Sequence, residues 1–87
     1  MAKYIEKNGE SIQDAIVILN VTSHYEGVGV EYEYLERKYG KRGKDWELER
    51  QFLVKEGDKY YDRMELKLSD GISKKIYFDI TSFFGKF

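Results

Sequence analysis

Apolar positions recur with a helical spacing in one segment of the chain. Between residues 23 and 39 an apolar side chain follows every three or four residues. These side chains are Tyr25, Val28, Tyr32, Leu35 and Tyr39. This spacing places all of them on one side of an α-helix. The pattern therefore predicts a single helix that packs its apolar stripe against a sheet.

Both ends of the predicted helix carry capping signals. Ser23 stands three residues before Glu26, the pairing of a serine cap with a glutamate in the first turn. Gly40 follows the last apolar position and is a natural C-cap. Gly27 and Gly29 each cost up to about 1 kcal/mol relative to alanine, so the first turns are expected to be weak.

Residues 15–21 form a short apolar run rich in β-branched side chains, with polar residues on both sides. Such a run is more typical of a buried strand than of a helix, although residues 11–14 could start a helix by the capping-box rule. A right-handed crossover would make this strand parallel to the strand after the helix if both share one sheet. The neighbours of this strand in the sheet stay open.

Three further segments alternate with period two. In the first, one parity holds Trp46, Leu48, Arg50, Phe52 and Val54. Arg50 is the polar exception within this parity, and Leu53 is the apolar exception in the other. Residues 60–68 and 76–80 alternate in the same way, with turn signals between the segments. The three segments predict an antiparallel meander.

Together these elements predict an α+β fold, in which one helix packs on a mostly antiparallel four-stranded sheet. The expected order is strand, helix and three strands, followed by a short aromatic C-terminal turn. Residues 1–10 are expected to form a polar arm and residues 11–87 a single domain. The tail, residues 81–87, holds three phenylalanines and is expected to fold back on the core, because their exposure would leave a sticky patch.

Composition excludes several functional classes. The 87 residues contain no cysteine, which excludes disulfides, thiolate nucleophiles and sulfur-ligated metal sites. No apolar run has the length of a membrane span, and the first residues lack the apolar core of a signal peptide, so we expect a cytoplasmic protein with no membrane partner. No catalytic, metal or cofactor motif is present. The sequence therefore predicts no catalytic residue, no metal site and no cofactor, and it leans away from an enzyme.

Aromatic residues give the leading functional hypothesis. Eight tyrosines, five phenylalanines and one tryptophan are more rings than a thin core needs, and exposed aromatic side chains anchor protein interfaces. The predicted contact residues are Tyr34, Tyr60, Tyr61, Tyr77, Phe83 and Phe84. We therefore expect a small protein-interaction module that binds a protein partner or associates with itself through exposed aromatics.

A basic loop supports the alternative hypothesis of a nucleic-acid-binding domain. Residues 38–46 join cations to glycines and to rings on which a base could stack. The candidate contact residues are Lys38, Lys41, Arg42, Lys44 and Trp46. Nucleic acid is the less favoured partner, because the formal net charge is only −1 and residues 1–36 are strongly acidic.

Two aspartates deserve inspection as paired carboxylates for acid–base chemistry. Asp62 and Asp79 each lie in a segment otherwise rich in apolar residues. Acid–base work would need two carboxyl groups that converge in one pocket. Charge on the solvent side of the sheet is the favoured interpretation of both residues.

Overall fold

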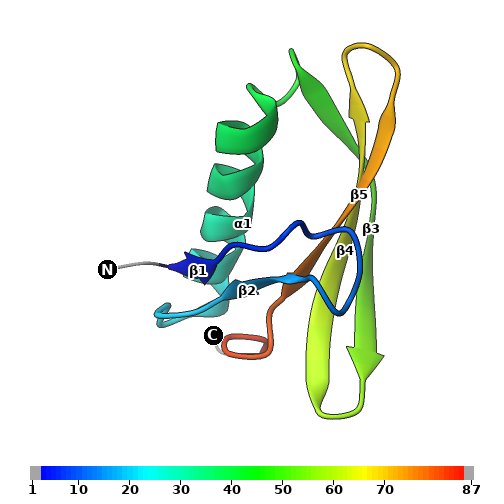
Figure 1. Cartoon of the computed structure of the whole chain (residues 1–87). Helices are drawn as coiled ribbons and strands as arrows, with labels where there is room; N and C mark the ends of the chain where they lie inside the picture. Colours follow the sequence, from blue (N-terminus) through cyan, green and yellow to red (C-terminus); the bar gives the residue numbers. More distant parts are fainter. Residues whose placement is uncertain (1–2, 86–87) are drawn as a thin grey trace.

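The computed structural model describes residues 3–85 (Figure 1). The chain forms β1 (Tyr4–Ile5), β2 (Ile16–Ile18), α1 (His24–Tyr39), β3 (Trp46–Glu56), β4 (Lys59–Leu68) and β5 (Ser73–Asp79). The predicted α+β class, with one helix on a mostly antiparallel sheet, is confirmed. The sheet has five strands instead of four, because a part of the predicted polar arm pairs with it as β1.

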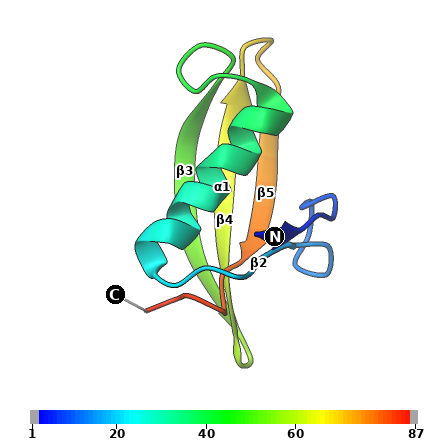
Figure 2. The same cartoon turned by 90° about the vertical axis from the view of Figure 1, so that its left-hand side faces the viewer.

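The strand order is β1-β2-β5-β4-β3. Strands β3, β4 and β5 form the predicted antiparallel meander, and β2 joins it by pairing with β5 in parallel. The neighbour of β2 that the sequence left open is thus β5. Because β3 also runs parallel to β5, β2 and β3 share one direction, as expected for a crossover within one sheet. Figure 2 shows α1 lying diagonally across β3, β4 and β5.

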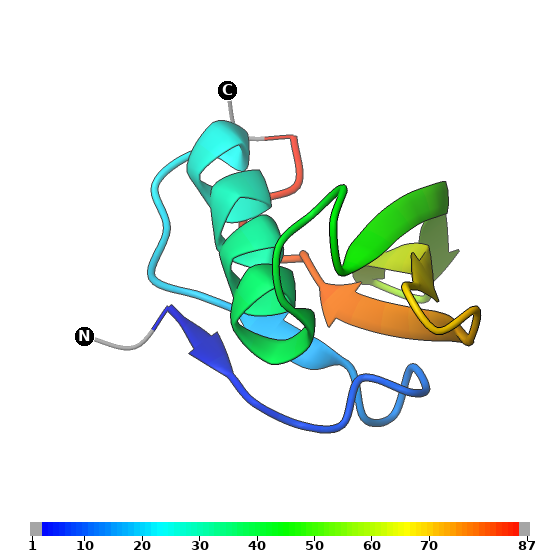
Figure 3. The same ribbon diagram turned by 90° about the horizontal axis from the view of Figure 1, so that it is seen from above.

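One face of the sheet carries the helix and the other has no layer on it, as the view from above shows (Figure 3). We call the second face the open face. The core lies between α1 and the sheet, and its largest side chains include Trp46, Tyr34 and Phe78. The fold therefore places a helical layer on one side of the sheet only.

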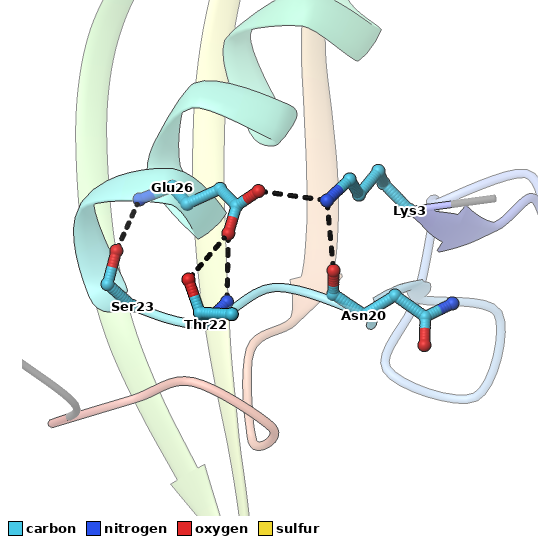
Figure 4. Close-up of polar contacts among 5 residues, drawn as sticks. All are labelled: Lys3, Asn20, Thr22, Ser23 and Glu26. Atoms are coloured by element: carbon cyan, nitrogen blue, oxygen red, sulfur yellow. Dashed lines mark hydrogen bonds and ion pairs between the residues drawn. The ribbon is translucent and has the colours of Figure 1, made fainter. Parts of the chain in front are cut away.

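The two predicted caps of α1 are confirmed, and Figure 4 shows the one at its start. The Ser23 hydroxyl accepts a hydrogen bond from the Glu26 backbone N–H at 3.1 Å, and Gly40 ends the helix at a φ of 104°. The Glu26 carboxylate accepts hydrogen bonds from the Thr22 N–H and from the Lys3 ammonium, both at 2.8 Å. These bonds, the one from Lys3 first, lower the pKa of Glu26 to about 2. The start of the helix is thus tied to the chain that precedes it.

The buried side of α1 differs from the predicted stripe. Tyr25 is 90% exposed, and Leu35 is the one stripe residue that is fully buried. The buried helix residues are Gly27, Val30, Glu31, Tyr34 and Leu35. The buried face of α1 differs from the predicted stripe for two reasons. Tyrosine is amphipathic, so an apolar position does not require burial, and the tail packs where the helix has no side chain.

The tail folds back as predicted, as far as it is described. Phe83 is fully buried, and a side chain at Gly27 would collide with its ring. The ring of Phe84 stacks on Tyr60 with 4.4 Å between centroids. Gly27 therefore admits the tail to the core, which explains why a glycine is placed inside a helix.

A β-bulge reverses the faces of β3. Leu48 lies opposite Leu66, but Arg50 lies opposite Glu65, so Glu49 is an extra residue on the β3 side. Beyond the bulge Gln51, opposite the core residue Met64, faces the helix side.

The single parity predicted for this strand is therefore wrong after residue 48. Trp46 and Leu48 point to the helix side, whereas Phe52 lies opposite Arg63 on the open face. One inserted residue exchanges the two faces, because side chains alternate along a strand. The bulge accounts for the exceptional positions of Arg50 and Leu53 in the alternating pattern.

Candidate interaction surface

Strand β3 lies at the margin of the sheet and is paired on one side only, with β4. In an antiparallel pair every second residue directs its N–H and C=O away from the neighbour, so an edge strand offers these groups to another chain. The start of β3 is covered, because the Gly43 N–H donates to the Trp46 carbonyl at 2.7 Å. Regular pairing with β4 resumes after the bulge and runs from Arg50 to Glu56. We call residues 50–56 the free stretch.

The free stretch exposes two adjacent large apolar side chains. Leu53 is 54% exposed and Phe52 is 38% exposed. Ile5, Tyr25 and Ile72 are the other exposed large apolar residues of the described chain, and each of them stands alone in the sequence. Single exposed apolar residues are ordinary. Two adjacent exposed apolar residues on an edge strand are a typical site for pairing with a further strand.

Charged side chains surround this apolar centre. The Arg63 guanidinium lies over the Phe52 ring, 4.4 Å from its centroid, and reaches Glu65 at 3.4 Å. Arg50 contacts the same glutamate at 3.3 Å. The ammonium of Lys55 lies 5.7 Å from the centroid of the Tyr60 ring. The open face is therefore polar around Phe52, and the apolar surface is confined to the edge.

The six predicted contact residues separate into two groups. Tyr34, Tyr61 and Phe83 are buried, so their expected exposure is wrong. The other three predicted residues, Tyr60, Tyr77 and Phe84, are half-buried. The structure does not gather the six into one patch, because they lie on the helix, on β4 and β5, and in the tail.

Tyr34 shows why a tyrosine can join the core. Its ring packs edge-to-face against Tyr4 at 5.3 Å and against Phe78 at 5.7 Å. Its hydroxyl donates to Glu6 at 3.5 Å and accepts from Lys38 at 3.3 Å. Burial, followed by the charge of Glu6, raises the pKa of Tyr34. The core thus uses the ring, while the hydroxyl keeps polar partners at the rim.

The basic loop is a structured connection between α1 and β3. Lys41, Arg42 and Lys44 are exposed, as a phosphate contact would require. Trp46, however, is 1% exposed, and its indole N–H donates to the Gly40 carbonyl at 2.7 Å. The prediction that a base stacks on Trp46 is therefore wrong, because the ring serves the core.

Residues of the basic loop already make contacts within the chain. The Asp45 carboxylate accepts a hydrogen bond from the Lys41 N–H at 2.7 Å, and Arg42 lies over the Tyr32 ring at 4.8 Å. Lys38 is exposed as well and lines a cleft of about 700 Å³, whose other walls come from the loop before β2 and from β3, β4 and β5. Four cations and three carboxylates line this cleft. Because the charges in the cleft are mixed, it does not favour the binding of a polyanion.

Both predicted aspartates are buried, so neither is the solvated charge that the sequence favoured, although Asp79 does lie on the open face. They do not form a pair: Asp62 lies opposite Phe78 on the helix side, and Asp79 lies opposite Tyr61 on the open face. Asp62 instead meets the fully buried Glu31 of α1.

The Glu31 carboxyl accepts no hydrogen bond from an amide, hydroxyl or cation of the described residues. Burial, and then the charge of Asp62, raises the pKa of Glu31 well above its usual range. Both residues of the pair are buried, so we expect the pair to affect the stability of the fold. The sequence did not predict this pair. The position of Glu31 four residues after Gly27, on one helix face, was the available signal.

Within residues 3–85 no cluster of three or more histidine, aspartate or glutamate side chains could hold a metal ion. No helix in the described part of the chain is long and apolar enough to cross a membrane. Comparisons with protein-family models, with curated proteins and with solved structures found no match.

Proposed function

We propose that the chain is a small protein-interaction module that binds its partner through the free stretch of β3. The observation that carries this proposal is the adjacent exposure of Phe52 and Leu53 on an edge strand that is paired on one side only. A partner strand that adds to this edge gains backbone hydrogen bonds and covers both side chains at once. The mode of binding is thus strand addition.

The edge fits this mode better than the open face does. On the open face Phe52 already lies under Arg63, which is held by Glu65. A partner on that face would have to displace these contacts, whereas a partner at the edge meets backbone groups that β4 does not use. The half-buried rings of Tyr60, Tyr77 and Phe84 lie outside the free stretch, so we assign them no more than peripheral contacts with the partner.

Nucleic-acid binding stays the weaker alternative. Its remaining support is the exposure of Lys41, Arg42 and Lys44. These cations lie in the loop before β3 and not on the free stretch. Since Trp46 is buried, the loop offers charge without a stacking tryptophan.

The experiment is site-specific photo-crosslinking in nuclease-treated extract of the source cells. A photoreactive phenylalanine replaces Leu53 in one sample and Ile72 in the other, because Ile72 has a similar exposed fraction of 51% but lies in the β4 to β5 turn. We expect a discrete protein adduct from position 53 and none from position 72.

Equal adducts from both positions, or none from position 53, would contradict the proposal. Capture on the unmodified protein that disappears with nuclease and with Lys41→Ser, Arg42→Ser and Lys44→Ser would favour the nucleic-acid alternative.

A further inference from the structure

We infer that the partner at this edge is a second copy of the same chain. Two β3 strands pair antiparallel around a twofold axis at Leu53, so that one sheet continues through both copies. This inference rests on the proposed function and specifies the partner. A twofold contact uses the same surface on both copies, so that surface must be complementary to itself.

The free stretch meets that requirement. It reads Arg-Gln-Phe-Leu-Val-Lys-Glu, and its midpoint is Leu53. With the axis at Leu53, Arg50 lies opposite Glu56 of the second copy, Gln51 opposite Lys55, and Phe52 opposite Val54. Opposite charges meet at both ends and apolar side chains meet in the centre, which are the favourable cross-strand pairs of antiparallel sheets.

The faces of the side chains agree with this register. Directly opposed residues of an antiparallel pair lie on the same face of the sheet. Arg50 and Glu56 lie opposite Glu65 and Lys59 of β4, on the open face, so they can meet across the axis. Leu53, on the helix side, meets its own copy.

Neighbouring registers are worse. An axis at Phe52 would place Arg50 against Val54 and would bring the bulged Glu49 opposite Lys55. An axis at Gln51 would place Arg50 against Phe52 and Glu49 against Leu53. Only the axis at Leu53 lets the regular stretch from Arg50 to Glu56 pair wholly with itself.

The groups needed for the contact are accessible in the single chain. The Arg50 side chain is 71% exposed where it meets Glu65, so solvent weakens that ion pair and the guanidinium can turn to a new carboxylate. Glu56 is exposed beside the turn to β4. Figure 2 shows the tip of the β3 and β4 hairpin extending past the start of α1.

The test uses two charge-reversal variants in sedimentation equilibrium. We expect the unmodified chain to associate reversibly to a dimer. Arg50→Glu places two glutamates against each other at both ends of the contact, and Glu56→Arg does the same with arginines. Each variant alone should dimerise at least about tenfold more weakly, because two favourable pairs become repulsive.

An equal mixture of the two variants should regain dimerisation. One copy then carries glutamate at positions 50 and 56 and the other carries arginine at both, so every cross-strand charge pair is again opposite. Recovery in the mixture is specific to this register. Single variants that dimerise like the unmodified chain, or a mixture without recovery, would overturn the inference.

Leu53→Lys places two ammonium groups at the axis and should abolish dimerisation, with circular dichroism checking that the monomer stays folded. Ile72→Lys is the matched control and should dimerise like the unmodified chain. A chain that stays monomeric at every attainable concentration overturns self-pairing. Crosslinks from position 53 to a different protein would then leave the proposed function standing, and their absence would remove both.

Discussion

Strands β3 and β4 face each other along their whole length, yet they differ in what covers them. In β4, Met64 and Leu66 are completely buried under the helix. Opposite Met64, Gln51 of β3 is exposed, and Leu53 beyond it is more than half exposed. At these positions the inner strand β4, which has two neighbours, has its apolar side chains covered. The opposed residues of the edge strand β3 stay exposed to solvent. Strand position therefore separates the residues that stabilise the fold from those to which our proposal assigns binding.

The largest effect is expected at the tail, which closes the covered side. Phe83→Ala should lower the free energy of unfolding by about 3–5 kcal/mol, because it empties a fully buried ring site against Gly27. Urea denaturation followed by circular dichroism measures this change. A loss below about 1 kcal/mol would show that the tail is not part of the core.

A pair of cross-strand substitutions tests the comparison directly. Met64→Ala should cost about 2–5 kcal/mol of stability, as expected for a buried side chain of that size. Gln51→Ala, its neighbour on β3, should stay within about 0.5 kcal/mol of the unmodified chain. The same denaturation measurement checks both. Similar costs at both positions would mean that β3 is covered in solution under the conditions used.

The covered side also contains an unfavourable feature, the buried carboxyl of Glu31 beside Asp62. Glu31→Gln should stabilise the fold at neutral pH by about 1–3 kcal/mol, because the amide can donate to Asp62 without the proton uptake on folding that the raised pKa of Glu31 requires.

The dependence of stability on pH gives the sign of this effect. Folded Glu31 keeps its proton above its ordinary pKa of 4.5, whereas the unfolded chain releases it. Stability should therefore fall as the pH rises above about 4.5, and this slope should be reduced in Glu31→Gln. Unfolding series at several pH values test it. An unchanged slope would contradict the assignment.

The smallest effect is expected at the exposed cap of α1. The pKa of Glu26 is lowered to about 2 from 4.5, so its contribution is present above pH 4.5 and is lost as the pH falls towards 2. Glu26→Gln should flatten this acid limb. Lys3→Met should flatten it in part, since the bond from Lys3 is the first cause of the shift. The free energy of unfolding measured at a series of acidic pH values checks this prediction. If both variants showed the same pH dependence as the unmodified chain, the role of Glu26 in the cap would be contradicted.

Sequence patterns predicted the class of the fold, the two caps of α1 and the return of the tail, because each depends on local spacing or on a short apolar cluster. The bulge at Glu49 was not predicted, because its signal in the sequence, the exceptional positions of Arg50 and Leu53, also fits a regular strand with two exceptions. The burial of Tyr34 was missed for another reason: its ring and its hydroxyl have opposite preferences, and only tertiary packing decides between them.

The candidate site was found only in part. The sequence predicted a surface for a protein partner and assigned it to tyrosines and tail phenylalanines, whereas our proposal places it on β3. The more informative signal was Leu53, an apolar residue at a position that alternation marks as exposed. Its meaning depends on the strand order, because the same residue on a central strand would be covered. Strand order follows from long-range pairing, which the alternation does not contain.

The most direct test of the central claim is hydrogen exchange of the backbone amides of β3, measured over a range of protein concentrations. If the free stretch pairs with a second copy, alternate amides between Arg50 and Glu56 should exchange more slowly as the concentration rises, while the Met64 amide on β4 changes little. Exchange of the β3 amides that is fast and independent of concentration would contradict the pairing of two copies.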